Sequence, residues 1–111
     1  MTDATELLDL WDAGGTPDRL AVKIAVKASL ATLVDVAPGH AVEVRVPPFA
    51  AVQAIEGTRH RRGTPPAVVE CDARTWLSLA TGRVAWADAV ADGRVRASGE
   101  RSDLSACFPL S

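Results

Sequence analysis

Residues 16–37 constrain the fold more than any other stretch of this sequence. Thr16 is a favourable N-cap, Pro17 suits the first position of a helix, and Pro38-Gly39 is a stop signal. The stretch therefore predicts a helix of about 20 residues, about 30 Å long. A narrow polar stripe recurs every four residues along it, formed by Arg19, Lys23 and Lys27. Nearly everything else is apolar, so we expect the helix to lie between two surfaces, either a sheet and another helix or a sheet and a cavity.

The same stretch does not predict a membrane span. Lys23, Lys27 and Asp35 lie inside it, and each is costly at the depth of the hydrocarbon core. We therefore expect no integral insertion into a membrane.

A periodicity of two begins after residue 40 and predicts a sheet. Val42, Val44 and Val46 alternate with small or charged residues, which is typical of a half-buried strand. Further strands are expected at residues 49–55, 67–71 and 94–98. One-sided burial is typical of antiparallel sheets with helices on a single face. The expected fold class is α+β: a mainly antiparallel, curved sheet of about four to five strands, covered on one face by helices.

A short helix is expected near the N-terminus. Asp3 followed by Glu6 resembles a capping box, and Gly14-Gly15 ends the segment. Its apolar face is predicted to consist of Leu7, Leu8, Leu10 and Trp11.

Three more helices are expected in the second half of the chain. Asp72 is predicted to cap one that ends at Gly82. The next ends before Gly93 and presents Trp86, Ala89 and Val90. The last begins at Ser102 and presents Leu104 and Phe108 before Pro109. No repeat or linker divides the sequence, so residues 1–111 are predicted to form one domain.

The net charge of the chain does not produce an overall positive electrostatic field that would attract nucleic acid. The formal net charge is −2 and the isoelectric point is near 5.6, while aromatic residues make up only 5%. The one basic concentration, at residues 59–62, has no aromatic neighbour. We therefore expect no nucleic-acid partner.

Cysteine usage and the N-terminal residues predict a cytoplasmic protein. Cys71 and Cys107 do not form a C-x-x-C pair, and the first residues lack the charged and apolar regions of a signal peptide. The two cysteines and two histidines show no metal-ligand spacing, and no acid–base pair indicates catalysis. We predict no enzymatic activity, no metal and no cofactor.

Cys71 has two interpretations. With His60 upstream it is a candidate thiol–imidazole nucleophile, and otherwise it is a structural cysteine. Its neighbours Glu70 and Asp72 favour the structural interpretation, because nearby negative charge raises a thiol pKa.

Two segments carry a family resemblance. Residues 75–82 (TWLSLATG) and 93–100 (GRVRASGE) resemble the signature of the sterol carrier protein family, and residues 42–54, 62–66 and 68–70 resemble a short actinobacterial-type branch of it. The resemblance covers about residues 17–110. It implies a sheet covered on one face by helices, with a hydrophobic tunnel between them for lipids, fatty acyl chains or sterols. Such domains also occur fused to enzymes, including thiol-dependent isomerases, where they are accessory.

Apolar residues from several predicted elements would line such a tunnel. The predicted ligand-binding set is Leu30, Leu33, Val44, Phe49, Val52, Trp76, Leu79, Trp86 and Phe108. The alternative interpretation is ordinary core packing, because large buried side chains dominate core energetics as well.

Arg62 is the predicted contact for an anionic head group. Arginine forks and free backbone N–H groups suit oxyanions, and Gly63-Thr64 follows it. The alternative is a solvated hairpin loop, as for most short charge runs.

The sequence leaves two kinds of function open. The first is non-catalytic binding or carriage of a hydrophobic small molecule. The alternative is protein–protein interaction through an apolar groove, either as a homodimer or as an accessory subunit of a thiol-dependent isomerase-like enzyme.

Overall fold

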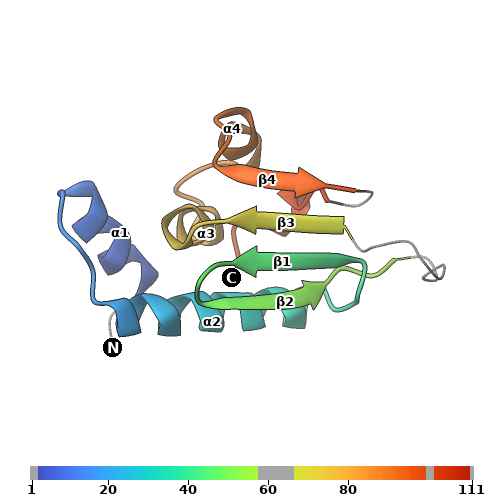
Figure 1. The fold of residues 1–111 in the computed structure, drawn as a ribbon, viewed down its shortest axis with the longest axis horizontal. Helices are drawn as coiled ribbons and strands as arrows, with labels where there is room; N and C mark the ends of the chain where they lie inside the picture. The colour runs from blue at the N-terminus through green and yellow to red at the C-terminus, as the bar shows by residue number, and fades with distance from the viewer. Residues whose placement is uncertain (1–2, 58–66, 100–101, 111) are drawn as a thin grey trace.

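The computed structural model describes residues 3–57, 67–99 and 102–110 (Figure 1). Its α-helices are α1 (Ala4–Asp12), α2 (Arg19–Val36), α3 (Ala73–Ala80) and α4 (Trp86–Ala91). Its strands are β1 (Val42–Val46), β2 (Ala50–Ala54), β3 (Ala67–Cys71) and β4 (Val95–Ser98). A 3-10 turn, η1, covers Ser105–Cys107. The fold class is therefore α+β, as predicted.

The described strands form one open, mixed sheet in the order β2-β1-β3-β4. β1 pairs antiparallel with β2, and β3 pairs antiparallel with β4. β1 and β3 are parallel, with Val42 opposite Ala67 and Val44 opposite Val69. Because β1 and β2 are antiparallel, β2 ends beside the start of β1. β3 pairs with the other edge of β1, starts at the same end of the sheet and therefore runs parallel to β1. The prediction of a mainly antiparallel sheet is therefore confirmed by the two outer pairings, while the central pairing is parallel.

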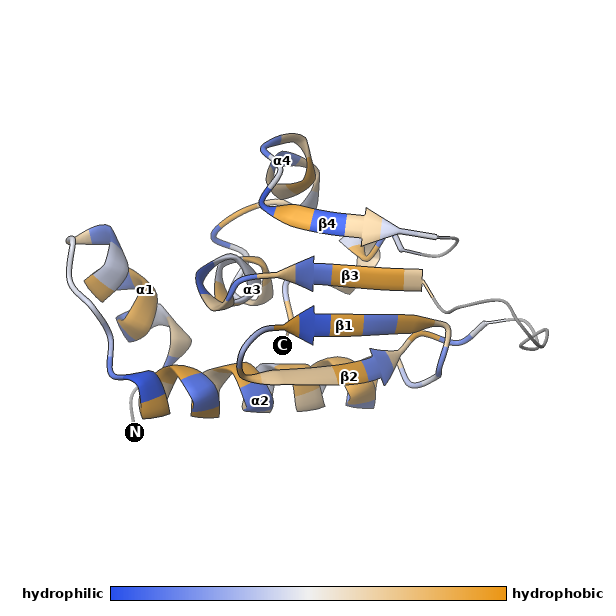
Figure 2. Cartoon of the chain, in the orientation of Figure 1, coloured by the Kyte–Doolittle hydropathy of each residue, from blue (hydrophilic) through white to orange (hydrophobic). Residues whose placement is uncertain are grey.

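The two faces of the sheet differ as the alternation predicts. Val42, Val44 and Val46 of β1 have no exposed surface, whereas Arg45 between them is exposed. Figure 2 shows the same alternation of hydrophobic and hydrophilic residues along β1. The inner face packs in one cluster with side chains of α2 and α3.

The start of α2 differs from the prediction. The N-cap is Asp18, whose carboxylate accepts a hydrogen bond from the Ala21 amide at 3.1 Å, and not Thr16. Aspartate is a stronger N-cap than threonine, so Asp18 takes the cap position. Pro17 therefore precedes the helix instead of opening it.

The far end of α2 is tied to β2. The Ile55 amide donates to the Ala37 carbonyl at 2.7 Å. A side chain at Gly39 would overlap the Ile55 backbone, so glycine is required at this close approach. These contacts fix α2 along the β2 edge of the sheet (Figure 1).

In the structure α2 buries only one side, which corrects the expectation of two covering surfaces. Val22, Val26, Leu30 and Leu33 are buried. Leu20 is 62% exposed and Ile24 is 48% exposed. The apolar composition of the helix indicates how much surface is available for burial, but the described part of the fold leaves one side of α2 exposed.

Three further expectations are corrected. Leu10 and Val90 are among the exposed large hydrophobic residues, because the short helices α1 and α4 bury other positions. The expected helix from Ser102 is only the turn η1. There Asp103 accepts from the Ser105 amide at 2.9 Å, a local bond that competes with helix formation.

Candidate functional site

The centre of the molecule is an apolar layer between the inner face of the sheet and the helices α2 and α3, called the inner layer below. Five residues of the predicted ligand-binding set lie in it with at most 1% of their surface exposed: Leu30, Leu33, Val44, Trp76 and Leu79. Asp72 positions the last two, because its carboxylate caps α3 by accepting from the Thr75 amide at 2.8 Å.

Aromatic side chains close one side of the inner layer. The Phe108 ring lies edge-on to Trp76, with ring centroids 5.5 Å apart, and is stacked on Trp86 at 5.9 Å. Such pairs add about 0.5–1.5 kcal/mol to the free energy of burial. Three members of the predicted set therefore meet, although Phe108 comes from the C-terminal end of the described chain.

One buried polar contact crosses the inner layer. Trp76 Nε1 donates to Ser29 Oγ at 2.7 Å, and Ser29 Oγ is 2.9 Å from the carbonyls of Ala25 and Val26, to which it donates. The indole N–H thus has a partner despite complete burial, as buried tryptophan requires. This contact joins α3 to α2.

Residues 104–110 form the C-terminal segment, which holds Phe108 in place. Leu104 is buried, and the Leu110 amide donates to the Ala80 carbonyl at 2.9 Å. Phe108 itself is only partly buried. Cys107 and Leu110 of the same segment also pack against the core.

Phe49 and Val52 lie at the margin of the inner layer and are partly buried. The guanidinium of Arg19 sits over the Phe49 ring, 5.4 Å from its centroid, in a cation–π contact. Sequence reasoning assigned Arg19 only to a polar stripe. Thirty positions separate the two residues, and no local signal connects them.

The predicted head-group contact Arg62 lies outside the described residues, together with Arg59, His60 and Arg61. Its role stays a prediction.

A surface cavity of about 450 Å³ lies near β4 and contains none of the predicted ligand-binding residues. Arg45, Glu70 and Arg96, which are opposite one another on three adjacent strands, contribute to it. Glu43 lies 2.7 Å from Arg45, and this hydrogen bond raises the pKa of Arg45 above its ordinary value. Charges of both signs therefore compensate one another across this outer face.

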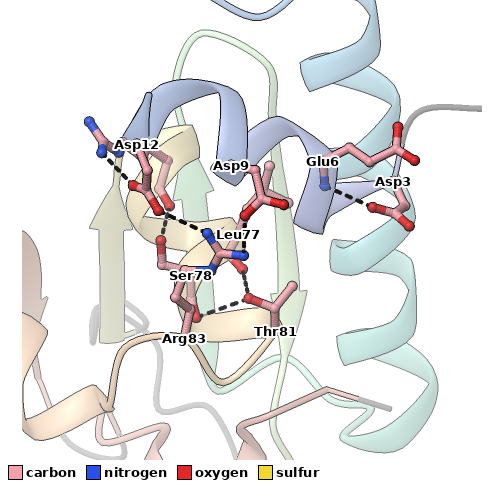
Figure 3. A network of polar contacts seen from close by, with 9 residues as sticks. Asp3, Glu6, Asp9, Asp12, Leu77, Ser78, Thr81 and Arg83 are labelled. Carbon is pink, nitrogen blue, oxygen red and sulfur yellow. Dashed lines mark hydrogen bonds and ion pairs between the residues drawn. The ribbon is translucent and has the colours of Figure 1, made fainter. Parts of the chain in front are cut away.

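A second polar network fastens α1 to the rest of the chain (Figure 3). Arg83 lies between two carboxylates of α1, 2.9 Å from Asp9 and 2.9 Å from Asp12. Arg74 of α3 lies 2.8 Å from Asp12. The hydrogen bond from Arg74, followed by that from Arg83, lowers the pKa of Asp12 below its ordinary value. These groups are solvent-exposed, so the network orients α1 more than it stabilises the fold.

Cys71 does not have the properties of a nucleophile. Burial first, and then the charges of Asp72 and Glu70, raise the pKa of its thiol to about 12. At neutral pH it is a protonated thiol at the end of β3, which agrees with the structural interpretation. Burial also raises the pKa of Cys107. Among the described residues, no three His, Cys, Asp or Glu side chains gather in a way that could hold a metal ion.

The sequence that forms these elements matches a known protein family. The family model described as bacterial SCP ortholog matches residues 18–110. The chain belongs to the sterol carrier protein family. The matched range begins at the N-cap of α2 and includes every described strand, while α1 precedes it. A comparison with curated proteins finds no match.

The described helices of this sterol carrier protein domain do not resemble membrane spans. Within residues 3–57, 67–99 and 102–110, none combines the length and hydropathy that crossing a membrane requires.

Proposed function

We propose that this sterol carrier protein domain binds a hydrophobic small molecule, such as a lipid, a fatty acyl chain or a sterol-like compound, without catalysis. The inner layer is the proposed site. The observation that carries the proposal is the position of Phe108 at one side of this layer, where its partly buried ring contacts both Trp76 and Trp86. Among the described residues, the buried polar side chains are those of Thr75 and Ser78, and no charged side chain is buried, which suits an apolar ligand. Membership of the family supports the same conclusion.

Energetics explain why a site of this kind is closed without ligand. An empty, unrelaxed cavity of ~400 Å³ would cost ~10 kcal/mol at ~24 cal/mol per Å³, which is comparable to the whole stability of a small domain. The layer therefore opens only as the ligand enters. Displacing Phe108 costs less than separating α2 from α3, because the ring keeps part of its surface in water and its segment has one backbone bond to α3.

The polar end of the ligand is proposed to meet an arginine. Arg62 is the candidate from the sequence. Arg19 is a second candidate, because it lies beside Phe49 at the margin of the layer and its guanidinium already contacts an aromatic face. Both side chains suit a carboxylate or a phosphate.

The binding proposal is tested with protein purified under mild conditions. Native mass spectrometry identifies any carried lipid, and titrations with fatty acids, acyl thioesters and sterols are followed by tryptophan fluorescence and by melting temperature. A ligand selective for the native state raises the melting temperature with concentration. Absence of saturable binding across the three ligand classes contradicts the proposal.

The variant Phe108→Ala tests the site itself. We expect it to lower the melting temperature of the free protein and to bind acyl-chain probes several-fold more tightly, since the ligand no longer displaces the ring. Leu20→Ala, on the outer side of α2, is the matched control and leaves affinity unchanged. Equal affinity of wild type and Phe108→Ala would place the ligand elsewhere.

The head-group proposal is tested by conservative substitutions. Lysine keeps the charge of arginine but loses its planar fork. Arg62→Lys is expected to weaken binding of an acidic lipid and to spare the matching alcohol, whereas Arg61→Lys changes neither. The same pair of ligands tested with Arg19→Lys shows which arginine acts. If neither Arg62→Lys nor Arg19→Lys weakens binding of the acidic lipid, the proposal of an arginine contact is rejected.

The interpretation of residues 1–111 as one domain and the cytoplasmic location also stay predictions.

A further inference from the structure

The cavity near β4 gathers charged side chains from three neighbouring strands. In the register of the sheet, Glu70 of β3 lies between Arg45 of β1 and Arg96 of β4. Alternation places these three side chains on the outer face, because Val44 and Val69 beside them in the chain are buried on the inner face. All three line the cavity of about 450 Å³. The outer face therefore presents two cations and an anion at one place.

Two of these charges have no partner within the described chain. Arg45 is held by Glu43, which lies 2.7 Å away. Among the described residues, Glu70 and Arg96 make no ion pair with each other or with any other side chain. They are directly opposite on adjacent strands, yet the cavity lies between their charged groups. One carboxylate and one guanidinium are thus available to the same ligand.

The cavity also has an apolar side. Val68 contributes a half-buried side chain, and Val90 of α4 is 40% exposed. Ser98, opposite Val68 in the register, adds a hydroxyl group. The volume lies within the range of about 300–1,000 Å³ that is typical of small-molecule sites. The cavity therefore combines a cation, an anion and a short aliphatic surface.

This combination selects one class of ligand. A simple anion would meet the carboxylate of Glu70, and a simple cation would meet the guanidinium of Arg96, so each would face a like charge. A zwitterion avoids both conflicts. Its anionic group accepts hydrogen bonds from Arg96 and its ammonium group donates to Glu70, and both bonds are charge-assisted. A short aliphatic part would lie against Val68 and Val90 and leave water.

We propose that this cavity binds a small zwitterion with a short aliphatic part, of the class of the free aliphatic α-amino acids. Because the charges are partly in water, the site is weak, with a dissociation constant on the order of 1 mM. The charged residues of the cavity and the inner layer lie on opposite faces of the sheet. The proposal therefore does not rest on lipid binding.

The experiment is a nuclear magnetic resonance titration of the full chain, labelled with nitrogen-15, at neutral pH. The probe is L-leucine, from about 0.1 to about 50 mM, which brackets the expected dissociation constant. Saturable shifts are expected at the amides of Val68, Arg96 and Ser98. Isoamylamine lacks the carboxylate of leucine, and isocaproate lacks its ammonium group. Each is expected to bind about fivefold more weakly than leucine, or less.

Charge-removing variants assign the two contacts. Arg96→Gln is expected to weaken leucine about fivefold and to strengthen isoamylamine, because the like charge is gone. Glu70→Gln is expected to weaken leucine equally and to strengthen isocaproate. Arg94→Gln is the matched control and leaves all three affinities unchanged, since the Arg94 guanidinium lies 2.7 Å from Asp92 and is not part of the cavity. The spectrum of each variant shows whether it is folded.

Four outcomes overturn the proposal. The first is the absence of saturable shifts at these amides. The second is an analogue that binds as tightly as leucine. The third is unchanged leucine affinity in both Arg96→Gln and Glu70→Gln, and the fourth is equal weakening by Arg94→Gln.

Discussion

The two sides of α2 carry similar side chains in opposite surroundings. On the inner side Val26 and Leu33 have no exposed surface, while on the outer side Leu20 and Ile24 remain largely in water. The inner side is fixed by what faces it, above all Trp76, which is joined to Ser29 by a hydrogen bond. The apolar composition of a helix therefore predicts that it packs against something. Which of its residues are buried is decided by the side chains of the elements that contact it.

The largest expected effect is on the partner of the inner side. Trp76→Ala is expected to lower the free energy of unfolding by ~3–5 kcal/mol, because it removes a fully buried ring. Chemical denaturation measures it. Trp76→Phe, which keeps a ring but loses the bond to Ser29, is the milder control, and intact fold is checked by circular dichroism. A loss below ~1 kcal/mol for Trp76→Ala would mean that the inner side is not packed in this way.

Leu33→Ala tests the inner side of α2 directly. Leu33 has no exposed surface, so we expect a loss of ~2–5 kcal/mol from lost burial and the resulting cavity. Denaturation in urea should show a lower midpoint with an unchanged slope. If Leu33→Ala were no more destabilising than a substitution at Leu20, the distinction between the two sides would be lost.

A smaller effect is expected at the start of the helix, which both sides share. Asp18→Ala should cost ~1 kcal/mol, because it removes the side chain that accepts from Ala21. Thr16→Ala is the matched control and should change stability by less than ~0.5 kcal/mol. The reverse order would restore Thr16 as the cap and extend the helix by two residues.

The smallest effect is expected on the outer side. Leu20→Ala should change the stability of the monomer, measured at low micromolar protein, by less than ~0.5 kcal/mol, since little of its surface is buried. Alanine also keeps a high helix propensity. A loss of ~2 kcal/mol or more at this concentration would reveal a covering surface on α2 within the monomer.

Local signals in the sequence predicted much of this fold. The strand expected at residues 67–71 is observed as β3, and Asp72 caps the next helix as expected. Alternation placed Val42 and Val44 on the buried face. These features depend on neighbours within a few positions, which is why periodicity and capping rules identify them.

Features that depend on distant partners were not predictable in the same way. A period of two describes burial but not strand direction, so the parallel pairing of β1 and β3 was missed. The cation–π contact between Arg19 and Phe49 joins positions 30 apart. In the site, the sequence selected Trp76 and Phe108 as apolar residues, but their edge-to-face contact follows from the fold of the C-terminal segment.

The two thiols differ in how easily a reagent can reach them, so their labelling rates can report opening of the inner layer. Cys71 is 5% exposed, and its thiol pKa of about 12 makes it almost unreactive while the chain is folded. Cys107 is adjacent to Phe108 and only partly buried. A thiol reagent should therefore modify Cys107 faster than Cys71, which reacts only when the core around it opens. Slower labelling of Cys107 in the presence of a lipid that refastens the segment, or faster labelling if the segment stays displaced, would report the bound state without any added probe.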